Sequence, residues 1–261
     1  MITRFIALFK ASHFIPTLTV TTLTIALGWR TSDLTTALLI GLTFFSGQLI
    51  VGWSNDLIDY SDDLRHNRVS KPLVAGEISP TAVQIAISVD SLLLILLTIF
   101  GPLNNRFGVL HLVAVLSALA YNAKLKSTVF SFLPYLLSFG LLPIIVLGST
   151  QSPLKLWMAA IGGLFGVGVH VANVFKDLEE DRLSGILGLP QILGVMRSKY
   201  LCLATFGGSS LILYFATESN VALIILAASF IYLTPLPRIF AFPFSILLGL
   251  ATMAVFISFG I

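Results

Sequence analysis

Charged residues are scarce in this sequence. Only 10% of its 261 residues are charged, whereas 56% are hydrophobic. A soluble domain carries about 25% charged residues, so this chain cannot cover itself with a polar surface. The composition excludes a soluble globular protein and predicts an all-α polytopic membrane protein. The length favours one compact helical bundle, with residues 1–261 forming a single transmembrane domain.

Cysteine is nearly absent as well. Cys202 is the one cysteine in the sequence, which excludes a disulfide within the chain. The pattern does not predict a cleavable signal peptide either, because Arg4 and Lys10 precede the first apolar stretch but no small-residue cleavage region follows it. We therefore expect the first apolar stretch to cross the membrane.

Long apolar runs are what the chain has in abundance. Nine stretches approach the roughly 17–25 residues that cross a bilayer core. They are residues 13–29, 34–54, 80–100, 107–122, 129–149, 154–175, 199–217, 220–236 and 240–261. The fourth is short and the join between the seventh and eighth is tight, so eight spans is the alternative. We predict a bundle of about nine transmembrane helices.

The basic residues indicate how these spans are oriented. With the amino terminus inside, only Arg30, Arg106 and Lys155 of the 15 lysines and arginines fall in outer segments. An excess of basic residues in inner segments marks the cytoplasmic side. We therefore expect an integral protein of the cell membrane whose amino terminus is cytoplasmic.

Acidic residues number only 12, and most of them lie in two short segments, Asn55–Asp63 and Asn173–Asp181. In both segments an Asn is followed by Asp at +4 and at +8. The two units begin 118 residues apart and both lie at cytoplasmic ends of predicted spans. Ionisable groups at a membrane helix are costly, which favours a functional interpretation.

Each acidic segment is followed by a long polar connection, residues 64–79 and residues 182–198. Long structured connections in a compact bundle are usually functional. Ser79 and Pro80 form a good N-cap and first-turn pair for the next helix. We expect these connections to form a cap over the cytoplasmic mouth of the bundle.

Helical geometry separates candidate ligands from bystanders. At about 100° per residue, Asp56 and Asp63 lie within roughly 20° of each other, whereas Asp62 points away. The converging set is Asn55, Asp56, Asp59 and Asp63, with Asn173, Asp177 and Asp181. The bystanders Asp62, Glu179 and Glu180 are expected to be solvated or paired with Arg65, Arg68 or Arg182.

The donor types in this set indicate a particular cation. Many hard oxygen ligands with no Cys or His alongside favour Mg²⁺ over a transition metal. Lysines and arginines beside the acids indicate a diphosphate held by metal and cations together. A single acid at a membrane interface more often has no role, but two clusters with matched spacing on one membrane side favour a site.

These residues resemble a known family. Asn55-Asp56-x-x-Asp59-x-x-x-Asp63 resembles the first aspartate-rich motif of the UbiA superfamily of intramembrane prenyltransferases, and Asp177-x-x-x-Asp181 resembles the second. The segment that begins Lys71-Pro72-Leu73 is similar to the family's segment after the first motif, where Arg-Pro-Leu is frequent and Lys71 replaces the Arg.

A further element of the resemblance lies at the end of the fourth stretch. Tyr121-x-x-Lys124-Leu125-Lys126 resembles a family element that is commonly Tyr-x-x-x-Lys. Position +4 is Leu125 here, so Lys124 and Lys126 both stay candidates for the functional lysine. Asn122 lies beside Tyr121 and is within reach of a diphosphate bound there.

The resemblance implies a helical bundle with a central cavity open laterally to lipid, in which two Mg²⁺ ions bridge aspartates and an isoprenyl diphosphate. The residues it implies as catalytic are Asp56, Asp59, Asp63, Asp177, Asp181 and Lys126. Those expected to bind substrate are Asn55, Arg68, Lys71, Tyr121, Asn122, Lys124, Asn173, Lys176 and Arg182. The expected metal ligands are Asn55, Asp56, Asp59, Asp63, Asp177 and Asp181.

Three functions follow from this pattern. The leading one is Mg²⁺-dependent transfer of a prenyl group from a prenyl diphosphate to a lipophilic acceptor, an aromatic or quinone precursor, with no nucleic-acid partner. A membrane terpene cyclase of the same superfamily is the alternative, because it needs the same metals and diphosphate. A divalent-cation transporter is disfavoured, because transporters usually place their ligands near the bilayer midplane. The oligomeric state is open.

Two further features had competing interpretations. His13 opens the first stretch at a position where several relatives carry an Asn or Arg that faces the active site, but a lone interfacial histidine is slightly more often structural. The glycines Gly162, Gly163, Gly166 and Gly168 indicate close helix packing. A phosphate-binding loop is the rival interpretation, which the mid-membrane position and the missing Lys-Ser/Thr ending disfavour.

Overall fold

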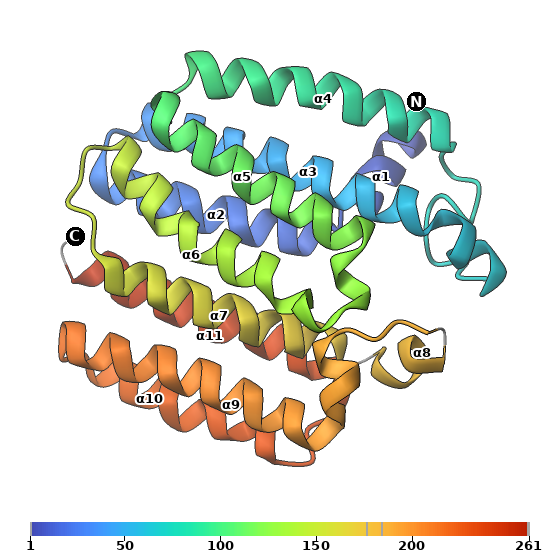
Figure 1. The fold of residues 1–261 in the computed structure, drawn as a ribbon. Coiled ribbons are helices and arrows are strands. Elements are labelled where there is room, and N and C mark those ends of the chain that lie inside the picture. The colour runs from blue at the N-terminus through green and yellow to red at the C-terminus, as the bar shows by residue number, and fades with distance from the viewer. Residues whose placement is uncertain (1, 176, 184, 260–261) are drawn as a thin grey trace. The chain divides into compact units, whose positions relative to one another are not determined.

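The computed structural model is helical throughout, apart from turns and short connections, over the residues that it describes, which are 2–175, 177–183 and 185–259. This confirms the predicted all-α class. The chain divides into two compact units, Met1–Ala123 and Lys124–Ile261 (Figure 1). Each unit holds one of the two acidic segments. The prediction of a single domain over residues 1–261 stays a prediction.

The first unit contains five α-helices. They are α1 (Ile2–Ala11), α2 (Phe14–Thr31), α3 (Leu34–Arg65), α4 (Pro80–Phe100) and α5 (Asn104–Ala123). Local caps define two of the starts. The Asp33 side chain accepts a hydrogen bond from the Thr36 amide at the start of α3, and Ser79 Oγ accepts from the Ala82 amide at the start of α4. With Pro80 in the first turn, the predicted cap of α4 is confirmed.

Helix α3 is the central helix of this unit. It packs against α2, α4 and α5, and its sequence is mostly apolar and carries no charged residue up to Trp53. Its 32 residues make it about 48 Å long, which exceeds the roughly 30 Å core of a bilayer. The last turns of α3, which carry Asn55–Asp63, therefore extend past the apolar part of the helix.

The described part of the second unit begins with two short 3₁₀ turns and contains six α-helices and two further 3₁₀ turns. In chain order these are η1 (Leu125–Ser127), η2 (Val129–Phe132), α6 (Leu133–Ser149), α7 (Leu156–Val174), α8 (Leu178–Leu183), α9 (Leu189–Thr217), α10 (Asn220–Ser229), η3 (Phe230–Leu233), η4 (Arg238–Phe240) and α11 (Ala241–Ser258).

Helix α7 has the central place in this unit, where it packs against α6, α9 and α11. Its glycines allow a close approach to α6, because a Cβ at Gly162 would run into the Phe139 carbonyl and a Cβ at Gly166 into the Tyr135 carbonyl. The packing interpretation of these glycines is confirmed. The first acidic segment thus lies on the central helix of its unit, and the second begins in the last turn of the central helix of its unit.

Among the residues that the structure describes, seven helical segments are long and apolar enough to cross a membrane. They are Leu34–Arg65, Pro80–Phe100, Asn104–Ala123, Val129–Ser149, Leu156–Val174, Leu189–Thr217 and Arg238–Ser258. The other two predicted stretches are helical as well, since α2 covers the first and Asn220–Leu233 covers the eighth. Threonines lower the hydropathy of α2, and Asn220–Leu233 is short. The count of nine spans and the cytoplasmic cap stay predictions.

Candidate active site

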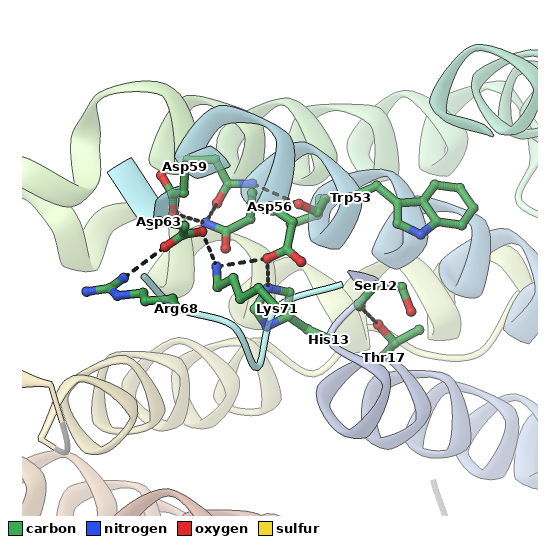
Figure 2. Close-up of polar contacts among 12 residues, drawn as sticks. Ser12, His13, Thr17, Trp53, Asp56, Asp59, Asp63, Arg68 and Lys71 are labelled. Carbon is green, nitrogen blue, oxygen red and sulfur yellow. Dashed lines mark hydrogen bonds and ion pairs between the residues drawn. The ribbon is translucent and has the colours of Figure 1, made fainter. Parts of the chain in front are cut away.

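The first acidic segment lies on an uninterrupted helix, because α3 continues to Arg65. Asp56 and Asp63 therefore share one face of the helix, as the sequence predicts. Asp56 and Asp63 are 3% and 1% exposed, and Figure 2 shows their carboxylates turned toward the same loop segment. Two carboxylates in such a place need positive charge close by, since unpaired buried charges are strongly unfavourable.

Lys71 supplies part of that charge. Its Nζ lies 2.9 Å from Asp56 Oδ1 and 3.0 Å from Asp63 Oδ2, so one ammonium group joins both carboxylates (Figure 2). Burial by itself would lower the pKa of Lys71, but the charges and hydrogen bonds of Asp56 and Asp63 raise it above its ordinary value. Lys71 is therefore a cation at neutral pH.

Two more side chains complete the charge around the pair. Arg68 Nη1 lies 3.1 Å from Asp63 Oδ1, and His13 Nε2 lies 3.2 Å from Asp56 Oδ1. Each carboxylate thus contacts Lys71 and one further nitrogen. Arg68 was expected to bind substrate or to pair with a bystander acid, but here it contacts a predicted metal ligand.

His13 is a site residue for which the sequence favoured a structural role. It lies between α1 and α2 with φ 53°, a left-handed conformation that turns the chain sharply. Trp53 Nε1 donates to the Leu8 carbonyl at 2.9 Å, and Gly52 allows the Ser12 carbonyl to approach α3 closely. These contacts dock the α1–α2 corner on α3 and bring the imidazole to Asp56. The left-handed turn had no Gly or Asn to signal it.

The loop that carries Lys71 is anchored by apolar side chains. Leu73 and Ile78 are 3% and 4% exposed, and they pack in one cluster with Trp53 and Val83. Backbone hydrogen bonds wind the loop into turns, among them Lys71 N to Arg68 O and Glu77 N to Pro72 O, both 3.0 Å. The position of the Lys71 ammonium is therefore set by a folded segment.

Asparagine side chains form the second part of this cluster. Asn55 Nδ2 donates to Asp59 Oδ2 and to Asn122 Oδ1, both at 3.3 Å. Asn122 Nδ2 donates to the Val51 carbonyl at 2.8 Å, which ties the end of α5 to α3. The structure thus brings five predicted residues of α3 and α5 into two sets of contacts. Asn55, Asp59 and Asn122 form one set, and Asp56 and Asp63 with Lys71 and Arg68 form the other.

The second acidic segment departs from the predicted geometry. Helix α7 ends at Val174 and α8 begins at Leu178, so Asn173, Asp177 and Asp181 do not share one continuous helix. The premise of one continuous helix is wrong there, and a common face of these residues stays a prediction. Asp181 N donates to Asp177 O at 2.8 Å, so these two acids still lie one helical turn apart. Gln191 Nε2, from the start of α9, donates to Asp181 Oδ2 at 2.9 Å.

The remaining predicted residues lie at different places. Tyr121 is half-buried near the end of α5, Lys124 and Arg182 are exposed, and Lys126 is half-buried in η1. Lys176 lies outside the described residues. Among the bystanders, Asp62 pairs with His66 at 3.4 Å and Glu179 pairs with Arg238 at 3.7 Å.

Within the described ranges, no three His, Cys, Asp or Glu side chains are grouped so as to hold a metal ion as they stand. In the first cluster, the cationic groups of Lys71 and Arg68 contact the carboxylates of Asp56 and Asp63 (Figure 2). The donor set nevertheless suits Mg²⁺, because carboxylate and amide oxygens are hard ligands. The position between Asp56 and Asp63 already accommodates a positive charge, that of Lys71.

Comparison with known proteins decides the family. The sequence matches the UbiA prenyltransferase family over residues 14–260. The chain belongs to this family. As a member of this family it is a membrane prenyltransferase. Curated protein sequences gave no match.

Solved structures show how widely the UbiA fold is shared. A UbiA homologue from Archaeoglobus fulgidus bound to DMAPP and Mg²⁺ has a TM-score of 0.75 and 18% identity, with 95% of this chain and 97% of that chain covered. The GPP and Mg²⁺ complex of a UbiA homologue from the same organism has a TM-score of 0.74 and 18% identity, with 98% and 100% covered. A digeranylgeranylglyceryl phosphate synthase has a TM-score of 0.71 and 17% identity, with 98% of each chain covered.

Proposed function

We propose that this UbiA-family protein catalyses Mg²⁺-dependent transfer of an isoprenyl group from a prenyl diphosphate to a lipophilic acceptor. The observation that carries the proposal is the buried pair Asp56 and Asp63 with a cation between them. Such a pair is costly for a membrane helix and suits a site that exchanges cations. The similar Archaeoglobus fulgidus structures hold DMAPP or GPP together with Mg²⁺.

The residues that would hold Mg²⁺ are the oxygen donors of the two clusters. These are Asn55, Asp56, Asp59, Asp63, Asp177 and Asp181. Bound Mg²⁺ would supply Lewis-acid stabilisation of the negative charge on the departing diphosphate.

The cationic and amide side chains of the protein have the complementary task of binding and orienting the diphosphate. Lys71 and Arg68 would bind phosphate oxygens when Asp56 and Asp63 exchange them for metal. Asn122 and Tyr121 would orient the diphosphate from the end of α5. Lys126, with Lys124, Asn173, Lys176 and Arg182, would add charge and hydrogen bonds from the second unit.

In the transfer step the bond between the allylic carbon and the diphosphate oxygen breaks, and its electron pair leaves with the diphosphate. The acceptor carbon or oxygen then forms the new bond to the allylic carbon and loses a proton. Apolar helices around the reacting carbon exclude water, which would otherwise capture the carbocation. We propose a central cavity within a single transmembrane domain for this step, with an aromatic or quinone-precursor acceptor entering from the bilayer.

The test is a reconstitution assay with purified protein. Labelled DMAPP and GPP are supplied with Mg²⁺, with and without a panel of lipophilic acceptors that includes aromatic, quinone-precursor and glyceryl phosphate compounds. We expect acceptor-dependent diphosphate release and a prenylated acceptor. Diphosphate release with a hydrocarbon product and no acceptor would instead support a cyclase.

The site assignment is tested by single substitutions in the same assay. Asp56→Ala, Asp59→Ala and Asp177→Ala should abolish Mg²⁺-dependent diphosphate release while the protein stays folded. Asp62→Ala is the matched control, because Asp62 pairs only at the surface with His66. Retained turnover in all three variants would contradict the assignment.

The proposed topology has nine spans, with the amino terminus and both acidic clusters on the cytoplasmic side of the cell membrane. Cys202 is buried, so single cysteines can be introduced as accessibility probes without removing it. Ala75→Cys, in the loop with Lys71, should react with an impermeant maleimide only from the cytoplasmic side. Gln151→Cys, at the end of α6, should react only from the outside. Labelling of both from one side would contradict the topology.

A further inference from the structure

Gln191 is a polar side chain that the prenyl-transfer chemistry described above does not use. It lies in the first turn of α9, is only 4% exposed, and donates from Nε2 to Asp181 Oδ2 at 2.9 Å. An amide nitrogen must face the carboxylate here, since an amide oxygen in that place would repel it. The contact crosses the loop between α8 and α9 and joins two elements of the second unit.

Within the described part of the chain, the oxygen of the Gln191 amide lacks the hydrogen bond that its nitrogen has. Gln191 Oε1 is buried and has no hydrogen-bond partner among the described residues. A buried amide that makes only one of its bonds is a poor contributor to stability, and an apolar side chain of the same size would avoid the cost. The amide is therefore explained by what its nitrogen does for Asp181.

The start of α9 is fixed independently of Gln191. The Leu189 amide donates to Ser131 Oγ at 2.9 Å, and Ser131 Oγ lies 3.0 Å from His170 Nε2. Ser131 and His170 are 0% and 1% exposed. These contacts hold the first turn of α9 against η2 and α7, so the Gln191 side chain starts from a fixed point.

Gly188 provides the space that this arrangement needs. A Cβ there would lie 2.6 Å from the Lys126 carbonyl oxygen and 2.8 Å from Gln191 Oε1. A backbone atom at such a distance cannot move aside cheaply. The same glycine thus admits the Gln191 amide and the backbone of Lys126, one of the two candidate lysines.

We infer that Gln191 is a positioning residue for the second acidic cluster, which holds the Asp181 carboxylate in the orientation that binds a divalent cation. This inference rests on the proposed function, in which Asp181 is a metal ligand. Outer side chains that hydrogen-bond a metal ligand orient it, and their loss typically weakens metal affinity about 10- to 100-fold. We therefore expect Gln191 to control the Mg²⁺ concentration at which the site fills.

The test measures Mg²⁺ binding by the full-length protein without substrate. Thermal unfolding is followed as a function of Mg²⁺ concentration, since a ligand that binds the folded state raises its melting temperature. Diphosphate release is then measured over the same Mg²⁺ series. Gln191→Met keeps the size and removes the donor, Gln191→Glu adds a like charge, and Gln191→His keeps a donor at a similar reach.

The expected result is that Gln191→Met raises the Mg²⁺ midpoint roughly tenfold or more in both readouts. Gln191→Glu should raise it further, and Gln191→His should bring it back toward the wild-type value. Gln84→Met is the matched control, on the exposed face of α4, and should leave the midpoint unchanged. A packing role alone would lower the melting temperature equally at every Mg²⁺ concentration, which would overturn the inference.

Asp181→Ala separates this inference from the proposed function. If Asp181→Ala shifts the Mg²⁺ midpoint and Gln191→Met does not, the inference is overturned while the ligand assignment stands. If Asp181→Ala leaves the midpoint unchanged, the ligand assignment itself is wrong and the role of Gln191 falls with it. Should Gln191→Met fail to fold, the contrast between Gln191→Glu and Gln191→His decides the question.

Discussion

Replacement of Lys71 by methionine would remove the ammonium group that joins Asp56 and Asp63. The side chain of Lys71 is 23% exposed, whereas those of Asp56 and Asp63 are 4% and 1% exposed. Removing one partner of a buried ion pair costs about 3–5 kcal/mol, because the remaining charge is left uncompensated. Since His13 and Arg68 stay in contact with the carboxylates, we expect a loss near the lower end, about 3 kcal/mol.

The assay is thermal unfolding of the purified protein at neutral pH without divalent cations. A loss of this size corresponds to a melting temperature lower by roughly 6–12 °C. Lys10→Met is the matched control, since Lys10 pairs with Glu77 at 3.3 Å and both side chains are exposed. Surface pairs of this kind contribute little, so the control should unfold close to the wild type. An unchanged melting temperature for Lys71→Met would refute the charge argument.

The pH dependence of this difference has a defined sign. The folded protein raises the pKa of Lys71 above its ordinary value. The folded protein therefore binds the Lys71 proton more tightly than the unfolded chain does. The stabilisation is fully present below the ordinary lysine pKa of about 10.4 and is lost as the pH rises through the higher folded value. The gap between wild type and Lys71→Met should stay constant from neutral pH to about 10 and narrow above that.

Three further substitutions test other parts of the structure. Ser79→Ala removes the cap of α4 and should lower stability by about 1 kcal/mol in chemical unfolding, with no effect on Mg²⁺ response. Gly166→Val should prevent α6 and α7 from packing, seen as loss of the monodisperse folded species in size-exclusion chromatography, whereas a folded variant would contradict the close approach. Gly188→Ala should displace Gln191 and raise the Mg²⁺ midpoint in the diphosphate assay, and an unchanged midpoint would show that the loop adapts.

The sequence was sufficient where structure follows from local pattern. Each of the nine apolar stretches corresponds to a helix, because a chain that must bury its backbone polar groups in lipid has little choice but to form helices. The shared face of Asp56 and Asp63 also follows from periodicity alone, since α3 is unbroken to Arg65. Periodicity is reliable as long as the helix continues.

The sequence was insufficient to predict contacts that depend on helix breaks and on the paths of loops. The break after Val174 has no Pro or Gly to signal it, so the continuous helix predicted through Asn173 and Asp181 was wrong. The contact of His13 with Asp56 depends on how the α1–α2 corner docks, and that of Gln191 with Asp181 on the path of a loop. Neither pairing has a fixed spacing that a sequence pattern could reveal.

The last turn of α3 has a consequence for how the protein responds to cations. A helix carries about half a negative charge at its carboxyl end, where the final carbonyl groups lack partners. Asp62 and Asp63 add two more negative charges at that end, which Arg65, the basic residue of the last turn, offsets only in part. The winding of this turn and the cations at Asp63, which are Lys71 and Arg68, are therefore thermodynamically coupled: a change that removes those cations favours fraying at the end of α3.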